Sequence, residues 1–90
     1  MIHILRTTDP TRVVRVTLGA RTLVEVIPAA GLPPDWQARA GANVLPPAAL
    51  GLAQAAAQSA RLELVALAQV TQLHEAEIAR APEEVPHAVV

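Results

Sequence analysis

Residues 47–81 read PAALGLAQAAAQSARLELVALAQVTQLHEAEIARA, and the rest of the chain must pack on this stretch or connect to it. Between Pro47 and Pro82 there is no proline, and most residues are alanine, leucine, glutamine, glutamate or arginine, which favour helices. Proline suits the first turn of a helix but clashes with the preceding turn further along. The sequence therefore predicts one long C-terminal α-helix over about 47–81, about 50 Å in length at ~1.5 Å per residue.

The predicted helix has two apolar sides. One is a heptad pattern, and the other lies elsewhere on the helical wheel and includes Leu52, Leu62 and Leu73. Two apolar sides need cover on both, either within the domain or from a second copy of the chain. The length of the predicted helix favours self-association. The predicted interface consists of Leu50, Ala53, Ala57, Ala60, Leu64, Leu67 and Ile78, together with Val89 and Val90 of the C-terminal tail.

The N-terminal third has the composition of β-strands. Residues 2–6 predict a short strand, and two segments rich in β-branched residues, 12–18 and 21–27, flank Gly19-Ala20. This pattern predicts a hairpin with a two-residue turn, in which Gly19 has a positive φ, Val16 faces Leu23 and Val13 faces Val26. The predicted fold class is α+β: a small antiparallel β-meander or hairpin over about 2–27, then a loop, then the long helix.

The whole chain, 1–90, is predicted to be a single small domain. Residues 1–28 form the hairpin or meander, residues 29–46 are a proline-rich connection with a short helical turn, and residues 82–90 are an extended tail. Trp36, the only aromatic residue, lies in the predicted turn. Two roles are open for it: a hydrophobic lid between the sheet and the long helix, or an anchor at an interface.

Catalytic and cofactor-binding motifs are missing from the sequence. No cysteine is present, and Ser59, the only serine, lies in the predicted helix without a nucleophile elbow. Only His74 and Glu77 have a spacing that would let two side chains share a metal, and two ligands do not make a site. We therefore expect no enzyme activity, no cofactor and no metal.

The charge pattern argues against nucleic acid as the main partner. The formal net charge is −1, and Arg12, Arg15 and Arg21 on the predicted hairpin have no lysine or stacking aromatic residue beside them. No apolar run is long enough for a transmembrane helix, and the N-terminus lacks the pattern of a signal peptide. We expect the protein in the cytoplasm or within an assembled particle, without a membrane partner.

These observations predict a non-catalytic structural protein that assembles with itself through its long helix and sheet, in a ring or larger assembly. A small virion component of a bacteriophage, in contact with other structural proteins, is the setting we expect. The alternative is a small adaptor or antitoxin-like regulator that binds another protein or DNA. Because the N-terminal part is net positive and residues 71–90 are net negative, head-to-tail contacts are expected, with the tail added to a neighbour's sheet edge.

Overall fold

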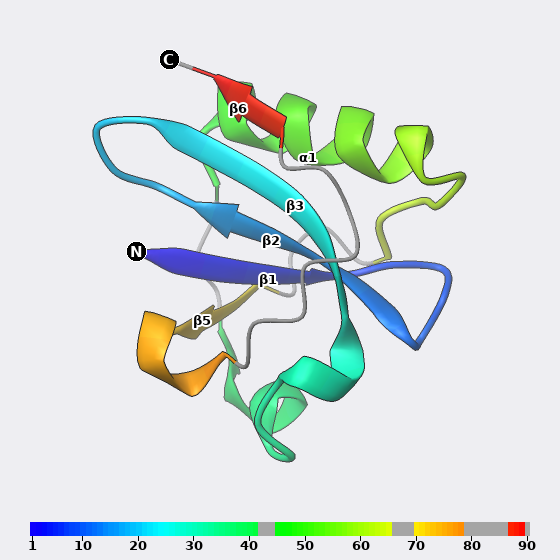
Figure 1. The fold of residues 1–90 in the computed structure, drawn as a ribbon, viewed down its shortest axis with the longest axis vertical. Helices are drawn as coiled ribbons and strands as arrows, with labels where there is room; N and C mark the ends of the chain where they lie inside the picture. The colour runs from blue at the N-terminus through cyan, green and yellow to red at the C-terminus, as the bar shows by residue number, and fades with distance from the viewer. Residues whose placement is uncertain (42–44, 66–69, 79–86, 90) are drawn as a thin grey trace.

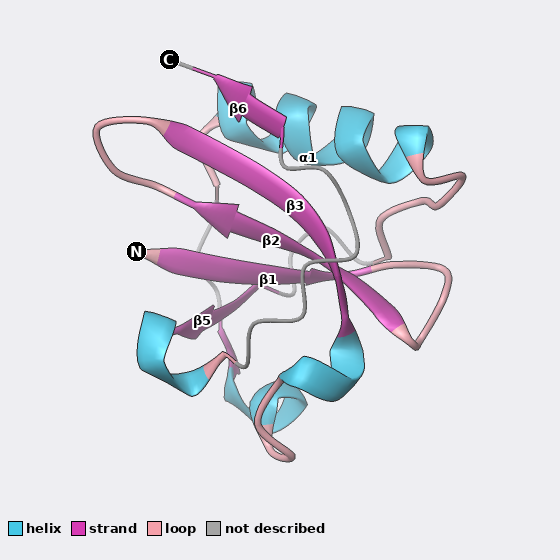
Figure 2. Cartoon of the chain, in the orientation of Figure 1, coloured by secondary structure: helices cyan, strands magenta, loops and turns pink. Residues whose placement is uncertain are grey.

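The structure of the chain is a computed structural model, which describes residues 1–41, 45–65, 70–78 and 87–89. An antiparallel β-sheet and one α-helix form its framework, so the fold is α+β as predicted (Figures 1 and 2). The helix, α1, spans Pro47–Ser59. Across the sheet, the strands lie in the order β4 (Ala40–Gly41), β5 (Val70–Leu73), β1 (Ile2–Arg6), β2 (Arg12–Thr17), β3 (Thr22–Pro28) and β6 (His87–Val89). Single 3-10 turns are η1 (Ala29–Gly31), η2 (Trp36–Arg39) and η3 (Glu75–Glu77).

Strands β2 and β3 form the predicted hairpin, but their register differs from the predicted one. Val16 lies opposite Val24 rather than opposite Leu23. No glycine in the described part of the chain has a positive φ, so the tight turn predicted at Gly19-Ala20 is wrong. The connection runs over residues 18–21 instead. A shift of one residue exchanges the two faces of a strand, so the correction changes which side chains β3 presents to the helix.

The predicted long helix is wrong beyond Ser59. Ala60 caps α1, and Arg61 adopts a left-handed conformation with φ of 60°. The backbone N–H of Leu62 donates to the carbonyl oxygen of Ala57 at 2.8 Å, and that of Arg61 donates to Gln58 at 2.9 Å. These two bonds form a Schellman motif, the common ending of helices in which glycine usually holds the left-handed position. Since arginine holds that position here, the sequence lacks the usual stop signal.

The residues after α1 return to the sheet rather than extending the helix. Leu64 forms an isolated bridge with Thr7, and β5 pairs antiparallel with β1, with Leu73 opposite Ile2. This pairing satisfies backbone N–H and C=O groups along the edge of β1, which outweighs the helical preference of the sequence. A helix over 47–81 would be about 50 Å long, whereas the longest extent of the molecule is 30 Å.

One face of the sheet is covered by α1. Valines of β2 and β3 and Leu5 of β1 pack against alanines on the inner side of the helix. In Figure 1, α1 lies beside β3, and the small alanine side chains of its inner side fill the space between helix and sheet. Burial of each valine or leucine side chain contributes about 1.5–3 kcal/mol. The buried members of this core are Leu5, Val14, Val16, Val24, Val26, Leu45, Ala49, Ala53, Ala56, Ala57 and Leu62.

The other face of the sheet has a core of its own, covered by the short turns. Trp36 of η2 is 7% exposed and packs there with Ile4 of β1 and Ile78, which follows η3. Trp36 is therefore a lid, which is one of its two predicted roles, but it lies on the face opposite α1 and not between sheet and helix. Further members of this core are Ile2, Val13, Ile27, Leu32 and Leu73. Both apolar faces of the hairpin are thus covered within one chain.

The end of the chain pairs with its own sheet. In β6, His87, Ala88 and Val89 lie opposite residues 22–24 of β3. The sequence predicts instead that the tail adds to the sheet edge of a neighbouring molecule. In the structure that pairing occurs within the chain, where the strand is held close to its partner by the covalent connection.

Candidate interaction surface

The outer side of α1 carries no charge. From Pro46 to Ala60 the sequence contains no aspartate, glutamate, lysine or arginine, although only one side of this segment is buried. An ordinary surface helix carries charged residues on its solvent side. The exposed residues of the segment are Pro46, Pro47, Ala48, Gly51, Gln54, Ala55, Gln58 and Ser59, and we call them the outer face of α1.

Small residues form a row along the outer face. Gly51, Ala55 and Ser59 are spaced four apart and therefore lie above one another on one side of the helix. A β-carbon added at Gly51 would meet no described atom within 4 Å. Glycine in a helix interior costs about 1 kcal/mol relative to alanine, and packing within the described chain does not require it. Such a row allows another backbone to approach closely.

A cavity of about 320 Å³ adjoins the outer face near the C-terminal end of α1. The described residues that line it are Gln54, Gln58, Leu62, Glu63 and Leu64. The Schellman motif redirects the chain at Arg61, and residues 62–64 then line the cavity together with two glutamines of the helix. Two hydrogen bonds with Thr8 then fix Glu63: its backbone N–H donates to Oγ1 at 3.1 Å, and its carbonyl oxygen accepts from the Thr8 N–H at 2.8 Å.

The side chains that line this cavity are partly polar and partly apolar. The amides of Gln54 and Gln58 supply hydrogen-bond donors and acceptors, Glu63 supplies a carboxylate, and the leucines supply apolar area. No nucleophile with an adjacent base lines it among the described residues. Within the described part of the chain, no three histidine, cysteine or acidic side chains lie close enough to hold a metal ion.

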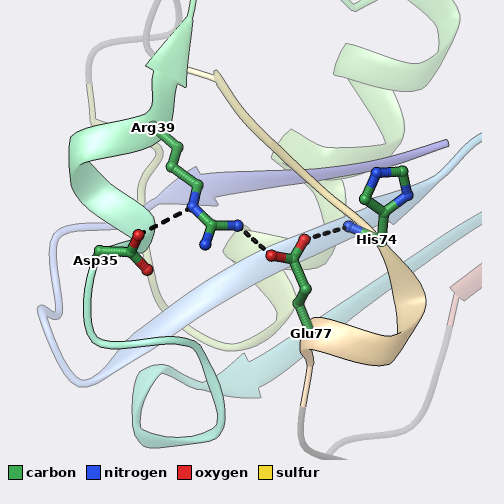
Figure 3. Close-up of polar contacts among 4 residues, drawn as sticks. All are labelled: Asp35, Arg39, His74 and Glu77. Carbon is green, nitrogen blue, oxygen red and sulfur yellow. Dashed lines mark hydrogen bonds and ion pairs between the residues drawn. The ribbon is translucent and has the colours of Figure 1, made fainter.

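A polar cluster on the opposite face of the sheet joins η2 to η3 (Figure 3). Arg39 Nε donates to Asp35 Oδ2 at 3.1 Å, and the Arg39 guanidinium also pairs with the Glu77 carboxylate. Glu77 Oε2 accepts the backbone N–H of His74 at 2.9 Å. The His74 N–H, and after it the Arg39 guanidinium, lower the pKa of Glu77 below its ordinary value. This cluster fastens the two turns that cover the second core.

Further titratable groups are buried in the sheet. Arg15 on β2 lies opposite Glu25 on β3 and forms an ion pair with it, and each side chain is 6% exposed. His3 on β1 is 3% exposed, and neither ring nitrogen has a hydrogen-bond partner. Burial, and then the positive N-terminus, lower the pKa of His3. Both effects favour the neutral form of the imidazole.

The residues predicted to form an interface lie mostly in the chain's own cores. Ala53 and Ala57 are buried under the sheet face of α1, and Ile78 is buried in the second core. The remaining predicted residues are placed as follows: Leu50, Ala60 and Leu64 are partly buried against the first core, Val89 is in β6, and Leu67 and Val90 lie outside the described residues.

Sequence reasoning missed the outer face of α1. A signal for it is present in the sequence, because residues 46–60 form a run of fifteen residues without charge. On a predicted helix that continued to residue 81, both sides were expected to be covered. The position of Gly51 and Ala55 on a side exposed to solvent was therefore not recognised. The hairpin arginines do not form one exposed patch, since Arg15 is buried with Glu25. His74 and Glu77 do come together, through a hydrogen bond from the backbone N–H of His74 to the carboxylate of Glu77.

Comparison of the chain with protein-family models, with curated proteins and with solved structures found no match. Among the described residues, no helix has the length and apolar character needed to cross a membrane.

Proposed function

We propose that the protein is a non-catalytic assembly protein, and that the outer face of α1 binds the same face of a second copy. The observation that carries this proposal is the uncharged, exposed row of small residues centred on Gly51 and Ala55. An uncharged face loses little hydration when it meets another uncharged face, whereas a charged partner would leave its own charges desolvated. The same surface on a second copy fulfils that condition.

A two-fold arrangement follows from the use of one face by both copies. Gly51 and Ala55 of each copy would lie at the crossing point, where the helices approach most closely. Gln54 and Gln58 would lie beside it, where their amides are able to hydrogen-bond across the contact. The proposed contact is therefore isologous. It replaces the head-to-tail contact that was expected from the charge distribution.

The size of the face limits the strength of the contact. A helix of 13 residues is ~20 Å long and ~10 Å wide, so two such faces bury on the order of 400 Å², below the ~1,000 Å² of a stable interface. We therefore propose that the contact extends onto the rim of the adjoining cavity and is weak in isolation. An isologous contact closes at the dimer, so further contacts would link such dimers in a larger particle. A virion of a bacteriophage remains the setting that we propose.

Sedimentation velocity over a series of concentrations tests the proposal. The mass of the unmodified chain is expected to rise above the monomer value of 9.4 kDa as concentration increases. Ala55→Arg places an unpaired charge in the contact and should abolish the rise. The matched control is Ala38→Arg on η2, which adds the same charge at an exposed site on the opposite face and should leave association unchanged. A mass that stays at the monomer value, or equal behaviour of the two variants, would overturn the proposal.

A further inference from the structure

The hydrophobic pattern of the β2–β3 hairpin does not determine its register. On β2, Val14 and Val16 face α1, while Val13 faces the second core. On β3, valines at 24 and 26 alternate with Ile27 and Leu23, so this strand is apolar on both faces as well. A slip of one residue between the strands would still present apolar side chains to both cores. Burial alone therefore leaves two registers close in free energy.

The turn does not exclude the second register. Gly19-Ala20 suits a two-residue hairpin turn, which would place Thr17 opposite Thr22. In the structure, Thr17 lies opposite Leu23, and the connection is longer than the tight turn. Since glycine accepts the conformations of the tight turn readily, the shorter connection is available to this sequence.

Charge distinguishes the two registers. In the observed register Arg15 lies opposite Glu25, and both side chains are buried on the face away from α1. The slipped register would place Arg15 opposite Val24 and would turn Glu25 towards α1, among the valines and alanines of the first core. The Glu25 carboxylate would then be buried without a partner there.

We propose that the buried Arg15–Glu25 pair selects the register of the hairpin, and that this selection, rather than added stability, is its role. Arg15 Nη1 lies 3.9 Å from Glu75 Oε1, but Arg15 Nε has no hydrogen-bond partner. An ion pair that is buried and incompletely hydrogen-bonded gains little over apolar residues of similar volume. The ion pair instead raises the free energy of the slipped strand register, as buried polar residues raise that of the wrong register in coiled coils.

Disulfide trapping measures the register directly, because the chain has no cysteine of its own. Thr17→Cys with Leu23→Cys reports the observed register, and Thr17→Cys with Thr22→Cys reports the slipped one. In the observed register the side chains at 17 and 22 point to opposite faces, which prevents a disulfide. In the otherwise unmodified chain, we expect the 17–23 pair to oxidise at least about tenfold faster than the 17–22 pair.

The decisive experiment introduces the same two cysteine pairs into a variant with Arg15→Leu and Glu25→Leu, which lacks both charges. We expect this variant to remain folded by circular dichroism and to form both disulfides at comparable rates. The exchanged pair, Arg15→Glu with Glu25→Arg, should restore the preference for 17–23. If the double leucine variant still forms only the 17–23 disulfide, the turn or the cores fix the register and the proposal is wrong. Loss of the folded state in that variant would also overturn it, because the pair would then be a source of stability.

Discussion

Replacement of Arg61 by glycine should stabilise the protein. Arg61 holds the left-handed position of the Schellman motif with φ of 60°, which costs an L-residue with a β-carbon about 1–2 kcal/mol. Glycine adopts this conformation freely but loses about 0.5–1 kcal/mol more chain entropy on folding. The difference predicts that Arg61→Gly raises the free energy of unfolding by about 0.5–1 kcal/mol. For a chain of this size, that corresponds to a rise of roughly 2–8 °C in Tm.

The assay is urea and thermal unfolding followed by circular dichroism, at a concentration where the chain is monomeric. Arg61→Ala is the control, because it removes the same charge and side chain but keeps the β-carbon. The free energy of unfolding of this alanine variant should exceed that of the parent chain by no more than a few tenths of a kcal/mol. If the glycine variant were no more stable than the alanine variant, Arg61 would not be left-handed in solution. The helix would then not end at Ala60 in a Schellman motif.

Further predictions concern α1, His3 and Glu77. Gly51→Ala should raise the free energy of unfolding of the monomer by about 1 kcal/mol, because alanine is the better helix former; chemical unfolding measures this effect. The same variant should weaken self-association, because its methyl group separates the two helices; sedimentation measures that effect. His3 has a folded pKa below its ordinary value of 6.5, so below that pH the unfolded chain binds more protons than the folded chain, and the free energy of unfolding should fall as pH drops from 6.5 towards the lowered pKa. His3→Leu should flatten the stability profile in that window; an unchanged profile would mean that His3 is not buried. The pKa of Glu77 is lowered from 4.5, so the stabilisation of the folded state by the ionised Glu77 is present above pH 4.5 and is lost as pH falls through the lowered pKa. Glu77→Gln should therefore lower Tm at neutral pH and converge with the parent chain in acid; a constant difference would contradict this assignment.

The start of α1 and the existence of the hairpin were predictable from the sequence. Pro47 marks the first helical turn, and the β-branched segments on both sides of Gly19 mark two strands. These features are set by local preferences, which a single sequence displays directly. The short turn before α1 is also found, as η2.

The end of α1 was not predictable in the same way. Arg61 is a good helix former, and nothing in the residues that follow it forbids a helix. Residues 70–73 become a strand because the edge of β1 needs a partner, which is a property of the folded sheet and not of the segment. The heptad pattern arose because Ala53 and Ala57 line one core while Ile78 lines another. A pattern produced by two separate cores resembled one continuous interface.

The most direct test of the proposed contact is cross-linking through a single cysteine on α1. Ala55→Cys would be the only thiol of each chain and would lie at the crossing point of the two copies. We predict that this variant forms a disulfide-linked dimer under mild oxidation, much faster than Ala38→Cys on the opposite face at the same concentration. Equal rates for the two variants would show that the outer face of α1 does not bind a second copy.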